Sequence, residues 1–248
     1  MAPSRHQVSA AAHEKVPHAN PLSSAQMEEL VEQAIRGNPS TAIDIGCGPG
    51  TFAVGLASRA PISVLAIDLN PAFLERGKSK SQSTSLVGSV AFLERPLQKD
   101  EGGQFDVVVC IGSSGAIGSP RDALQRCKGL MTPQGVLVFA ELVWTSEPAE
   151  GFLAFLGIEG AYYWLASESE SVFAQCGLSI EYENEASRSS WESYERAVLD
   201  GRLELAACLP PEEGESVRNR ATTWYANFEM HGRRYLGFNA YVARHAEA

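Results

Sequence analysis

The chain lacks any apolar run approaching the roughly 20 residues of a membrane span. Its first residues, MAPSRHQVSAAAHEKVPH, also lack the apolar core of a signal peptide. No CxxC pair occurs, which argues against a zinc site, and an odd number of scattered cysteines argues against a disulfide framework. We therefore expect a cytoplasmic protein without a bound metal, in which the five cysteines are buried, reduced thiols: Cys47, Cys110, Cys127, Cys176 and Cys208.

Positive charge is scarce as well. The 248 residues include 20 Lys and Arg against 30 Asp and Glu, which gives a formal net charge of -10 at pH 7. Binding to a phosphate backbone depends on Lys and Arg displacing counterions, so this balance disfavours nucleic acid as a partner. With 44% hydrophobic residues, a chain of this length can build one large domain with a sizeable core.

Short β-rich runs alternate with helical patterns over the first 150 residues. The runs TAIDIG, ISVLAIDL, FDVVVCIG and GVLVFAEL, with a weaker run LVGSVAFLE, are separated by helical stretches near 51–59, 71–80 and 119–130. Strands buried on both faces that alternate with helices predict a parallel, doubly wound sheet. Before the first strand, SSAQMEELVEQAIRGNP predicts an amphipathic helix. Residues 1–20, rich in Ala, Ser, Pro and His, are expected to be poorly ordered.

The rhythm changes after residue 150. A helical stretch at 152–177 leads into a predicted strand, GLSIEYENE, and an acidic, aromatic helical segment precedes a final strand, YLGFNAYVAR. We expect residues 21–248 to form a single domain. Within it, 185–232 would be a helical insertion that acts as a lid on the substrate side, since inserted segments often select the ligand.

A glycine-rich turn, GCGPG at 46–50, follows the strand TAIDIG. Such a turn lets backbone N–H groups approach a ligand closely. Two ligand classes use this geometry. GPGTFA at 48–53 fits the dinucleotide pattern G-x-G-x-x-[GA], with Asp68 about 20 residues further on. S-adenosylmethionine instead carries an ammonium group, which suits an acid just before the glycines, and Asp44 is in that place. Because a carboxylate would repel a diphosphate, Asp44 favours S-adenosylmethionine.

Four segments occur in the order DIGCGPG (44–50), AIDLNPAFLERG (66–77), FDVVVCIGSSGAIG (105–118) and LMTPQGVLVFAE (130–141). In this order they resemble the class I S-adenosylmethionine-dependent methyltransferases over residues 21–180. A narrower resemblance, to bacterial members acting on small molecules, includes CIGSS, ELVW at 141–144 and WESYE at 191–195. The resemblance implies a Rossmann-like α/β fold with a seven-stranded, mostly parallel sheet whose last strand is antiparallel, and S-adenosylmethionine as cofactor, converted to S-adenosylhomocysteine.

The resemblance also implies which positions contact the cofactor: Asp44, Gly46, Cys47, Gly48, Gly50, Asp68, Leu69, Leu97, Gly112 and Ser113. Asp44 would hold the amino acid end of the cofactor, Asp68 would accept hydrogen bonds from both ribose hydroxyls, and Leu69 would pack on the adenine. Pro96 occupies the place where many relatives have an acid that recognises the adenine amino group. A backbone carbonyl near Leu97 is therefore expected to replace that acid.

Methyl transfer from a sulfonium requires alignment and a dry pocket rather than a covalent protein intermediate. Glu141, at the end of a predicted strand, is the candidate for a base or for orienting the acceptor. Trp144, Trp191 and Tyr194 are predicted to form walls of the substrate pocket. Because the chain is acidic and lacks an Asn- or Asp-Pro-Pro-aromatic tetrapeptide, the acceptor is expected to be a small molecule.

Other functions remain open from the sequence. A degenerate methyltransferase fold could bind a cofactor or serve as a partner subunit without catalysis, and Pro96 keeps that interpretation open. A nicotinamide-dependent oxidoreductase would use the same glycine turn. Methylation of protein or RNA is the remaining alternative.

Overall fold

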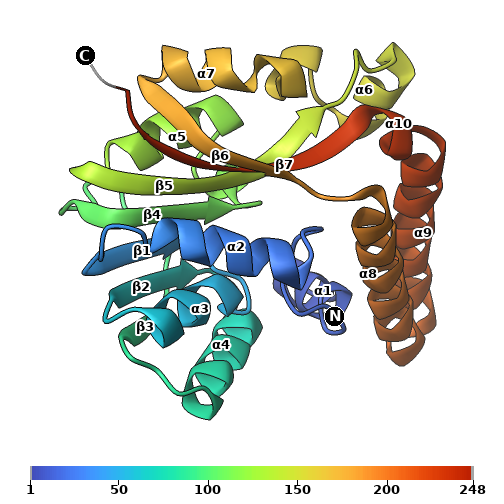
Figure 1. The fold of residues 1–248 in the computed structure, drawn as a ribbon. Helices are drawn as coiled ribbons and strands as arrows, with labels where there is room; N and C mark the ends of the chain where they lie inside the picture. The colour runs from blue at the N-terminus through green and yellow to red at the C-terminus, as the bar shows by residue number, and fades with distance from the viewer. Residues whose placement is uncertain (1, 247–248) are drawn as a thin grey trace.

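The computed structural model describes residues 2–246, which fold around a twisted seven-stranded sheet (Figure 1). The strands are β1 (Thr41–Ile45), β2 (Ser63–Asp68), β3 (Ser89–Glu94), β4 (Phe105–Ile111), β5 (Met131–Trp144), β6 (Leu178–Glu185) and β7 (Leu236–His245). Their order across the sheet is β3-β2-β1-β4-β5-β7-β6, and β7 runs antiparallel to both of its neighbours. The predicted parallel sheet with an antiparallel last strand is confirmed.

Helices cover both faces of the sheet, and further helices pack at one end of it (Figure 1). They are α1 (Arg5–Ala12), α2 (Ser24–Ala34), α3 (Thr51–Arg59), α4 (Pro71–Ser83), α5 (Pro120–Lys128), α6 (Glu150–Leu156), α7 (Ser169–Gln175), α8 (Arg188–Cys208), α9 (Pro211–Asn227) and α10 (Arg233–Tyr235). The helices expected near 51–59, 71–80 and 119–130 are α3, α4 and α5. The helical stretch expected at 152–177 is broken into shorter pieces, because α6 ends at Leu156 and the next residue, Gly157, has the left-handed φ of +68° that favours glycine.

Alternate residues of the central strands point to opposite faces, and each face has its own apolar core. Ala42, Val107 and Val138 pack with α2 and α3, whereas Ile43, Val108 and Leu137 pack with α5 and α7. The central strands are thus buried on both sides, which explains why their sequences are continuous apolar runs. In residues 2–246, no helix combines the length and the apolar character needed to span a bilayer.

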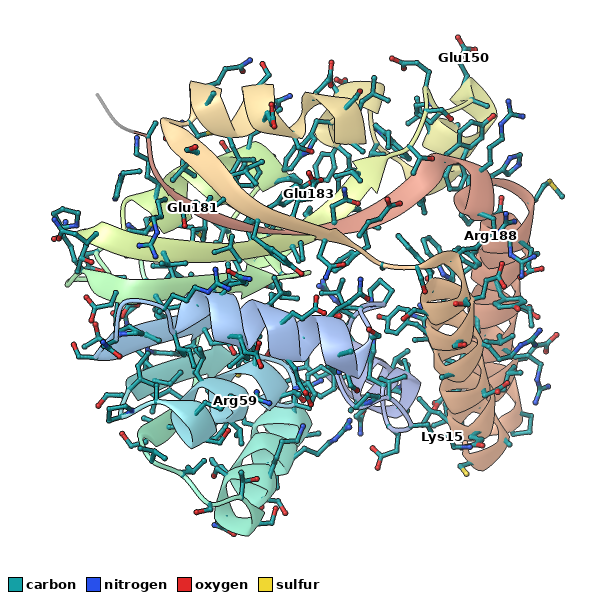
Figure 2. All side chains as sticks on the ribbon, in the orientation of Figure 1. Lys15, Arg59, Glu150, Glu181, Glu183 and Arg188 are labelled. Atoms are coloured by element: carbon teal, nitrogen blue, oxygen red, sulfur yellow. The ribbon has the colours of Figure 1, made fainter. Side chains whose placement is uncertain are left out.

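The N-terminal segment differs from the expectation of poor order. α1 begins with a capping box, in which the Ser4 side chain accepts a hydrogen bond from the Gln7 amide and the Gln7 side chain accepts one from the Ser4 amide. α1 packs against α8, where Gly201 leaves room for the Ala11 backbone; a Cβ at that glycine would lie 2.2 Å from the Ala11 carbonyl oxygen. Just after α1, Lys15, which is labelled beside α8 in Figure 2, forms an ion pair with Glu204 of that helix. These contacts join residues far apart in the sequence, so local composition does not reveal them.

The acidic segment at 185–232 contains α8 and α9, an antiparallel pair at one end of the sheet, close to α1 (Figure 1). A short π-helical turn, Phe228–Gly232, connects α9 to α10. Four of the five cysteines are buried as expected, but Cys208 is exposed because it is the last residue of α8.

Candidate functional site

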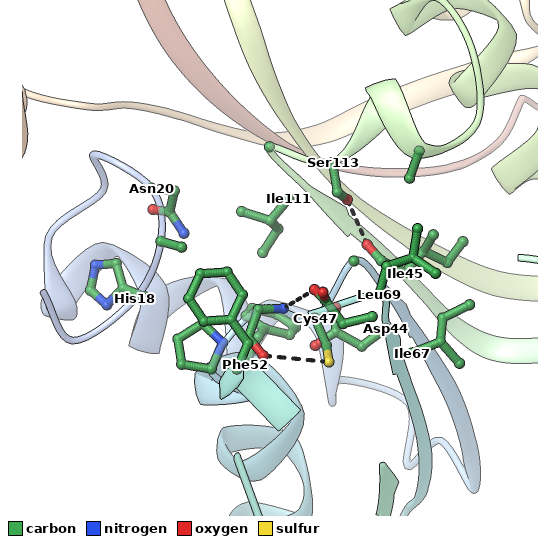
Figure 3. A pocket seen from close by; sticks show the side chains of 18 of the residues that line it. His18, Asn20, Asp44, Ile45, Cys47, Phe52, Ile67, Leu69, Ile111 and Ser113 are labelled. Carbon is green, nitrogen blue, oxygen red and sulfur yellow. Dashed lines mark hydrogen bonds between the residues drawn. The ribbon is translucent and has the colours of Figure 1, made fainter. Parts of the chain in front are cut away.

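A cavity of about 510 Å³, which we call the main cavity, opens at the carboxyl ends of β1, β2 and β4 (Figure 3). The strand order reverses between β1 and β4, and ligands of open α/β sheets bind at such a switch point. Nine of the predicted cofactor positions line this cavity: Asp44, Gly46, Cys47, Gly48, Asp68, Leu69, Leu97, Gly112 and Ser113.

The glycines of the turn at 46–50 have different roles. Gly46 has φ +66°, and a Cβ there would lie 2.5 Å from the Ser113 Cβ, so neither the backbone nor the space accepts a side chain. Gly50, also predicted to contact the cofactor, caps α3 and is not among the described residues that line the main cavity. A Cβ at Gly50 would lie 2.7 Å from the Phe92 ring, so this glycine serves packing between α3 and β3.

Asp44 lies at the floor of the main cavity, 3% exposed. The backbone amide of Ala53 donates a hydrogen bond to its carboxylate, but among the described residues its Oδ2 atom finds no partner. Burial, together with the negative charge of Asp68, raises the pKa of Asp44 to about 7. A buried carboxylate oxygen without a partner is unfavourable in the free protein, and it is a natural acceptor for a positively charged ligand group.

Asp68, at the end of β2, is held in place by two backbone amides. Gly48 donates to Oδ2 at 2.9 Å and Asn70 donates to Oδ1 at 2.8 Å. Asn70 caps α4, and Pro71 is the first residue of that helix, so Asp68 is not the helix cap. Each carboxylate oxygen can accept a further hydrogen bond, which leaves Asp68 able to bind hydroxyl groups of a ligand.

Ser113 ties the end of β4 to the end of β1. Its hydroxyl donates to the Ile45 carbonyl at 2.5 Å (Figure 3), and both residues line the main cavity. Cys47 is buried in the turn, and burial raises the pKa of its thiol, which disfavours a nucleophilic thiolate. This agrees with the expectation that Cys47 is a buried, reduced thiol.

A second cavity of about 240 Å³, which we call the side chamber, lies beside the main cavity. Aromatic and ionisable side chains line much of it: Glu141, Trp191, Tyr194, Glu195, Arg202, Trp224 and Phe238. The two cavities share part of their lining, namely His13, Ala19, Asn20, Gly112 and Tyr194. A group bound in one cavity therefore lies next to a group bound in the other.

Glu141 lines the side chamber and is 5% exposed. The Leu142 amide donates to its Oε1 atom at 2.9 Å. Burial raises the pKa of Glu141, and hydrogen bonds from Ser114 oppose that rise. Trp144, in contrast, does not form a wall. It lies in the core, and its indole N–H donates to the Gly160 carbonyl at 2.8 Å.

Glu195 is a site residue that the sequence did not reveal. Its carboxylate accepts hydrogen bonds from the indole of Trp191 at 3.4 Å and from that of Trp224 at 2.8 Å. It thereby joins α8 to α9 at the wall of the side chamber. Trp191 and Glu195 are four residues apart on one helix face, a spacing that could have suggested the first contact. The contact with Trp224 depends on how α8 and α9 pack together.

The N-terminal contribution to the site was also missed. His13, His18 and Asn20 line the main cavity, and the loop that carries His18 and Asn20 is visible beside it (Figure 3). The pattern S-x-x-Q at residues 4–7 was the available signal, because it predicts a helix start in a segment that otherwise resembles a disordered tail.

Comparisons with known proteins agree with this geometry. Residues 43–137 match a family described as a methyltransferase domain. Similar curated proteins include the ubiquinone biosynthesis O-methyltransferase of Acinetobacter baumannii, 28% identical over 120 residues, or 47% of this chain and 49% of the relative. That of Histophilus somni is 29% identical over 126 residues, or 49% and 52%. The chain spans about half the length of these curated relatives.

Solved structures share the fold over nearly the whole chain. A methyltransferase from Thiobacillus denitrificans, in complex with S-adenosyl-L-homocysteine, has a TM-score of 0.85 at 20% identity and covers 99% of this chain and 100% of its own. YjhP from E. coli has a TM-score of 0.86 at 16% identity, with 96% and 99% covered. Residues 43–137 thus match a methyltransferase domain, and the strand order and the glycine turn are similar to those of class I S-adenosylmethionine-dependent methyltransferases.

Proposed function

We propose that this protein transfers a methyl group from S-adenosylmethionine to a small-molecule acceptor. The observation that carries the proposal is the unpartnered, buried Oδ2 of Asp44 beneath the glycine turn, as seen among the described residues. A carboxylate there suits the ammonium group of the cofactor, and the oxygens of Asp68 suit its ribose hydroxyls. When bound, S-adenosylmethionine supplies an electrophilic methyl group on a sulfonium.

The adenine side of the cavity offers apolar surface rather than an acid. Leu69 is 47% exposed at the cavity, and Leu97 also lines it. Arg95 is engaged by Glu101 through a hydrogen-bonded ion pair at 2.6 Å, which fixes the loop that carries Pro96. We propose that Leu69 and Leu97 sandwich the adenine and that backbone groups near Leu97 recognise its amino group.

The side chamber is the proposed acceptor site. Trp191, Trp224 and Phe238 give it flat apolar walls, and its volume of about 240 Å³ suits a small planar molecule. Its helical wall comes from α8 and α9, which supports the interpretation of residues 185–232 as a substrate-side lid. Since the curated relatives are named O-methyltransferases, a hydroxyl is the first acceptor group to test.

Two measurements test the proposal. Calorimetric titration with S-adenosylhomocysteine should show binding to the wild-type protein and weaker binding to Asp68→Asn, by about 1.5 to 3 kcal/mol. Asp106→Asn is the matched control, because Asp106 accepts hydrogen bonds from Ser40 and Thr41 at the opposite end of the strands. No binding to the folded wild-type protein would refute the proposal.

The second measurement follows transfer of labelled methyl from S-adenosylmethionine to a panel of catechol, 4-hydroxybenzoate, tyramine and 2-phenylethylamine. Methylation of a panel member supports the proposal and shows whether oxygen or nitrogen receives the methyl group. Cofactor binding without methylation of any member would favour a cofactor-binding protein without catalysis.

A further inference from the structure

We propose that His13 and Tyr194 form a proton-accepting pair for the methyl acceptor, at the boundary between the main cavity and the side chamber. The inference rests on the proposed methyl transfer, and it names the residues that would take the proton released by the acceptor. His13 lies outside every segment by which the family resemblance was identified, and Tyr194 was predicted there only as a pocket wall.

The hydrogen bonds of His13 determine which nitrogen carries its proton. Nδ1 lies 2.7 Å from the Ser9 carbonyl oxygen, and Nε2 lies 2.9 Å from the Tyr194 hydroxyl. A carbonyl oxygen can only accept, so a neutral His13 has its proton on Nδ1. Nε2 is then the acceptor, and the Tyr194 hydroxyl donates to it. A nitrogen that already receives a hydrogen bond from a hydroxyl is placed to receive its proton.

The position of the pair distinguishes it from Glu141. His13 and Tyr194 line both cavities, whereas Glu141 contributes to the side chamber and is absent from the main-cavity lining within the described residues. A methyl group that passes from the cofactor to an acceptor must cross the boundary between the two cavities. The pair therefore lies where the acceptor atom has to be, and Glu141 is left to orient the rest of the acceptor.

The surroundings keep both partners in the protonation states that this role requires. Burial lowers the pKa of His13, and the positive charges of Arg202 on α8 and Arg76 on α4 lower it further, against the hydrogen bond to Ser9. Burial raises the pKa of Tyr194; the nearby Glu195 adds to the rise and Arg202 opposes it. At neutral pH the imidazole is neutral and can accept a proton, while the phenol keeps its own and relays it.

The proposed step balances in atoms and charge. The acceptor oxygen bonds to the methyl carbon as the carbon–sulfur bond breaks. The proton of the acceptor hydroxyl passes to Tyr194 Oη, and Tyr194 passes its own proton to His13 Nε2. The positive charge of the sulfonium is replaced by that of the imidazolium, so the net charge of the site does not change.

Other contacts, apart from the pair, hold the N-terminal segment in place. Arg76 donates to the His13 carbonyl at 2.9 Å, and Ser190 donates to the Pro21 carbonyl at 2.7 Å. A latch that merely closes the segment over the cofactor would use such contacts equally well. The control variants must therefore distinguish a proton-accepting pair from a latch.

The decisive variants are His13→Gln and Tyr194→Phe, which keep the approximate size of each side chain and remove the proton transfer. Using a panel member that is methylated, we expect each to lower kcat near neutral pH by about 100-fold or more, the lower end for general acid–base catalysis. The affinity for S-adenosylhomocysteine should stay close to wild type. The loss of kcat should shrink as pH rises past the acceptor's own pKa, because the acceptor then arrives deprotonated. His6→Gln, on the exposed face of α1, and Ser190→Ala should keep the wild-type pH profile.

A second readout needs no acceptor. Nitrogen NMR of the histidine rings in the S-adenosylhomocysteine complex should show His13 neutral at pH 7, with its proton on Nδ1. A cationic His13, or a proton on Nε2, would overturn the proposal. So would variants that weaken S-adenosylhomocysteine binding and lose kcat equally at every pH, which is the behaviour of a latch. The proposed function itself fails if the wild-type protein does not bind S-adenosylhomocysteine, or if it binds S-adenosylhomocysteine and methylates no panel member. In either case, NMR of the free protein still decides whether the pair can accept a proton.

Discussion

The substitution Asp44→Asn should have different effects on the stability of the fold and on the affinity for the cofactor. Asp44 is buried, its Oδ2 has no partner among the described residues, and its pKa is raised from 3.8 to about 7. The folded state therefore holds the proton more tightly than the unfolded state. The stability that comes from this proton is complete below pH 3.8 and is lost as pH rises through about 7. Wild-type protein should thus lose stability as the pH rises through this range. A variant with asparagine at this position should not show that loss, because asparagine has no ionisable group.

The magnitude follows from linkage. One pH unit between the two pKa values corresponds to about 1.4 kcal/mol, so raising the pH from about 5.5 to about 8 should remove about 2 kcal/mol of unfolding free energy through Asp44. The amide that the substitution introduces has its own cost, because its N–H groups need partners in a buried site. That cost is the same at both pH values and cancels when the effect of the substitution at one pH is subtracted from its effect at the other.

Urea unfolding of both proteins at the two pH values measures this difference. We expect the change in unfolding free energy caused by Asp44→Asn to be about 2 kcal/mol more favourable at pH 8 than at pH 5.5. The variant should bind S-adenosylhomocysteine more weakly than the wild-type protein at both pH values. Asp106→Asn should have the same effect at both pH values, since hydrogen bonds from Ser40 and Thr41 lower the pKa of Asp106 despite partial burial and the carboxylate is ionised throughout this range. An effect of Asp44→Asn that is equal at both pH values would refute the reasoning, because Asp44 would then not be protonated in the folded state.

Three further substitutions test the packing of the site. Gly46→Ala should destabilise the protein by about 1 to 3 kcal/mol in thermal unfolding, because φ is +66° and the new Cβ would meet Ser113; an unchanged Tm would contradict this. Glu195→Ala should cost about 1 to 3 kcal/mol and change the fluorescence of Trp224, whose indole N–H would lose its acceptor. Trp144→Phe should lower stability while leaving the KM for a methylated panel member unchanged, and a raised KM would show that Trp144 contacts the acceptor.

The grouping of the predicted cofactor positions around the main cavity could be predicted from the sequence because its geometry is local. Asp44 and the glycines after it lie on one strand and the turn that follows, and Asp68 ends the neighbouring strand. The carboxyl ends of parallel strands meet at one edge of a sheet, so recognising the strands was enough to bring these residues together. Gly50 was assigned to the ligand because the glycine pattern does not show which glycine faces a cavity and which faces a neighbouring ring.

The side chamber, which we propose as the acceptor site, could not be predicted in the same way, since it depends on the packing of helices that are distant in the sequence. His13 meets Tyr194 only because α1 approaches α8 closely, at Gly201, and Glu195 meets Trp224 only because α8 pairs with α9. Helical patterns give the buried face of each helix, but they do not give its partner or its register along that partner. The main cavity is therefore encoded within short segments, whereas the side chamber, our proposed acceptor site, is encoded in contacts between segments. A change at Gly201 should for that reason disturb the side chamber while leaving the glycine turn intact.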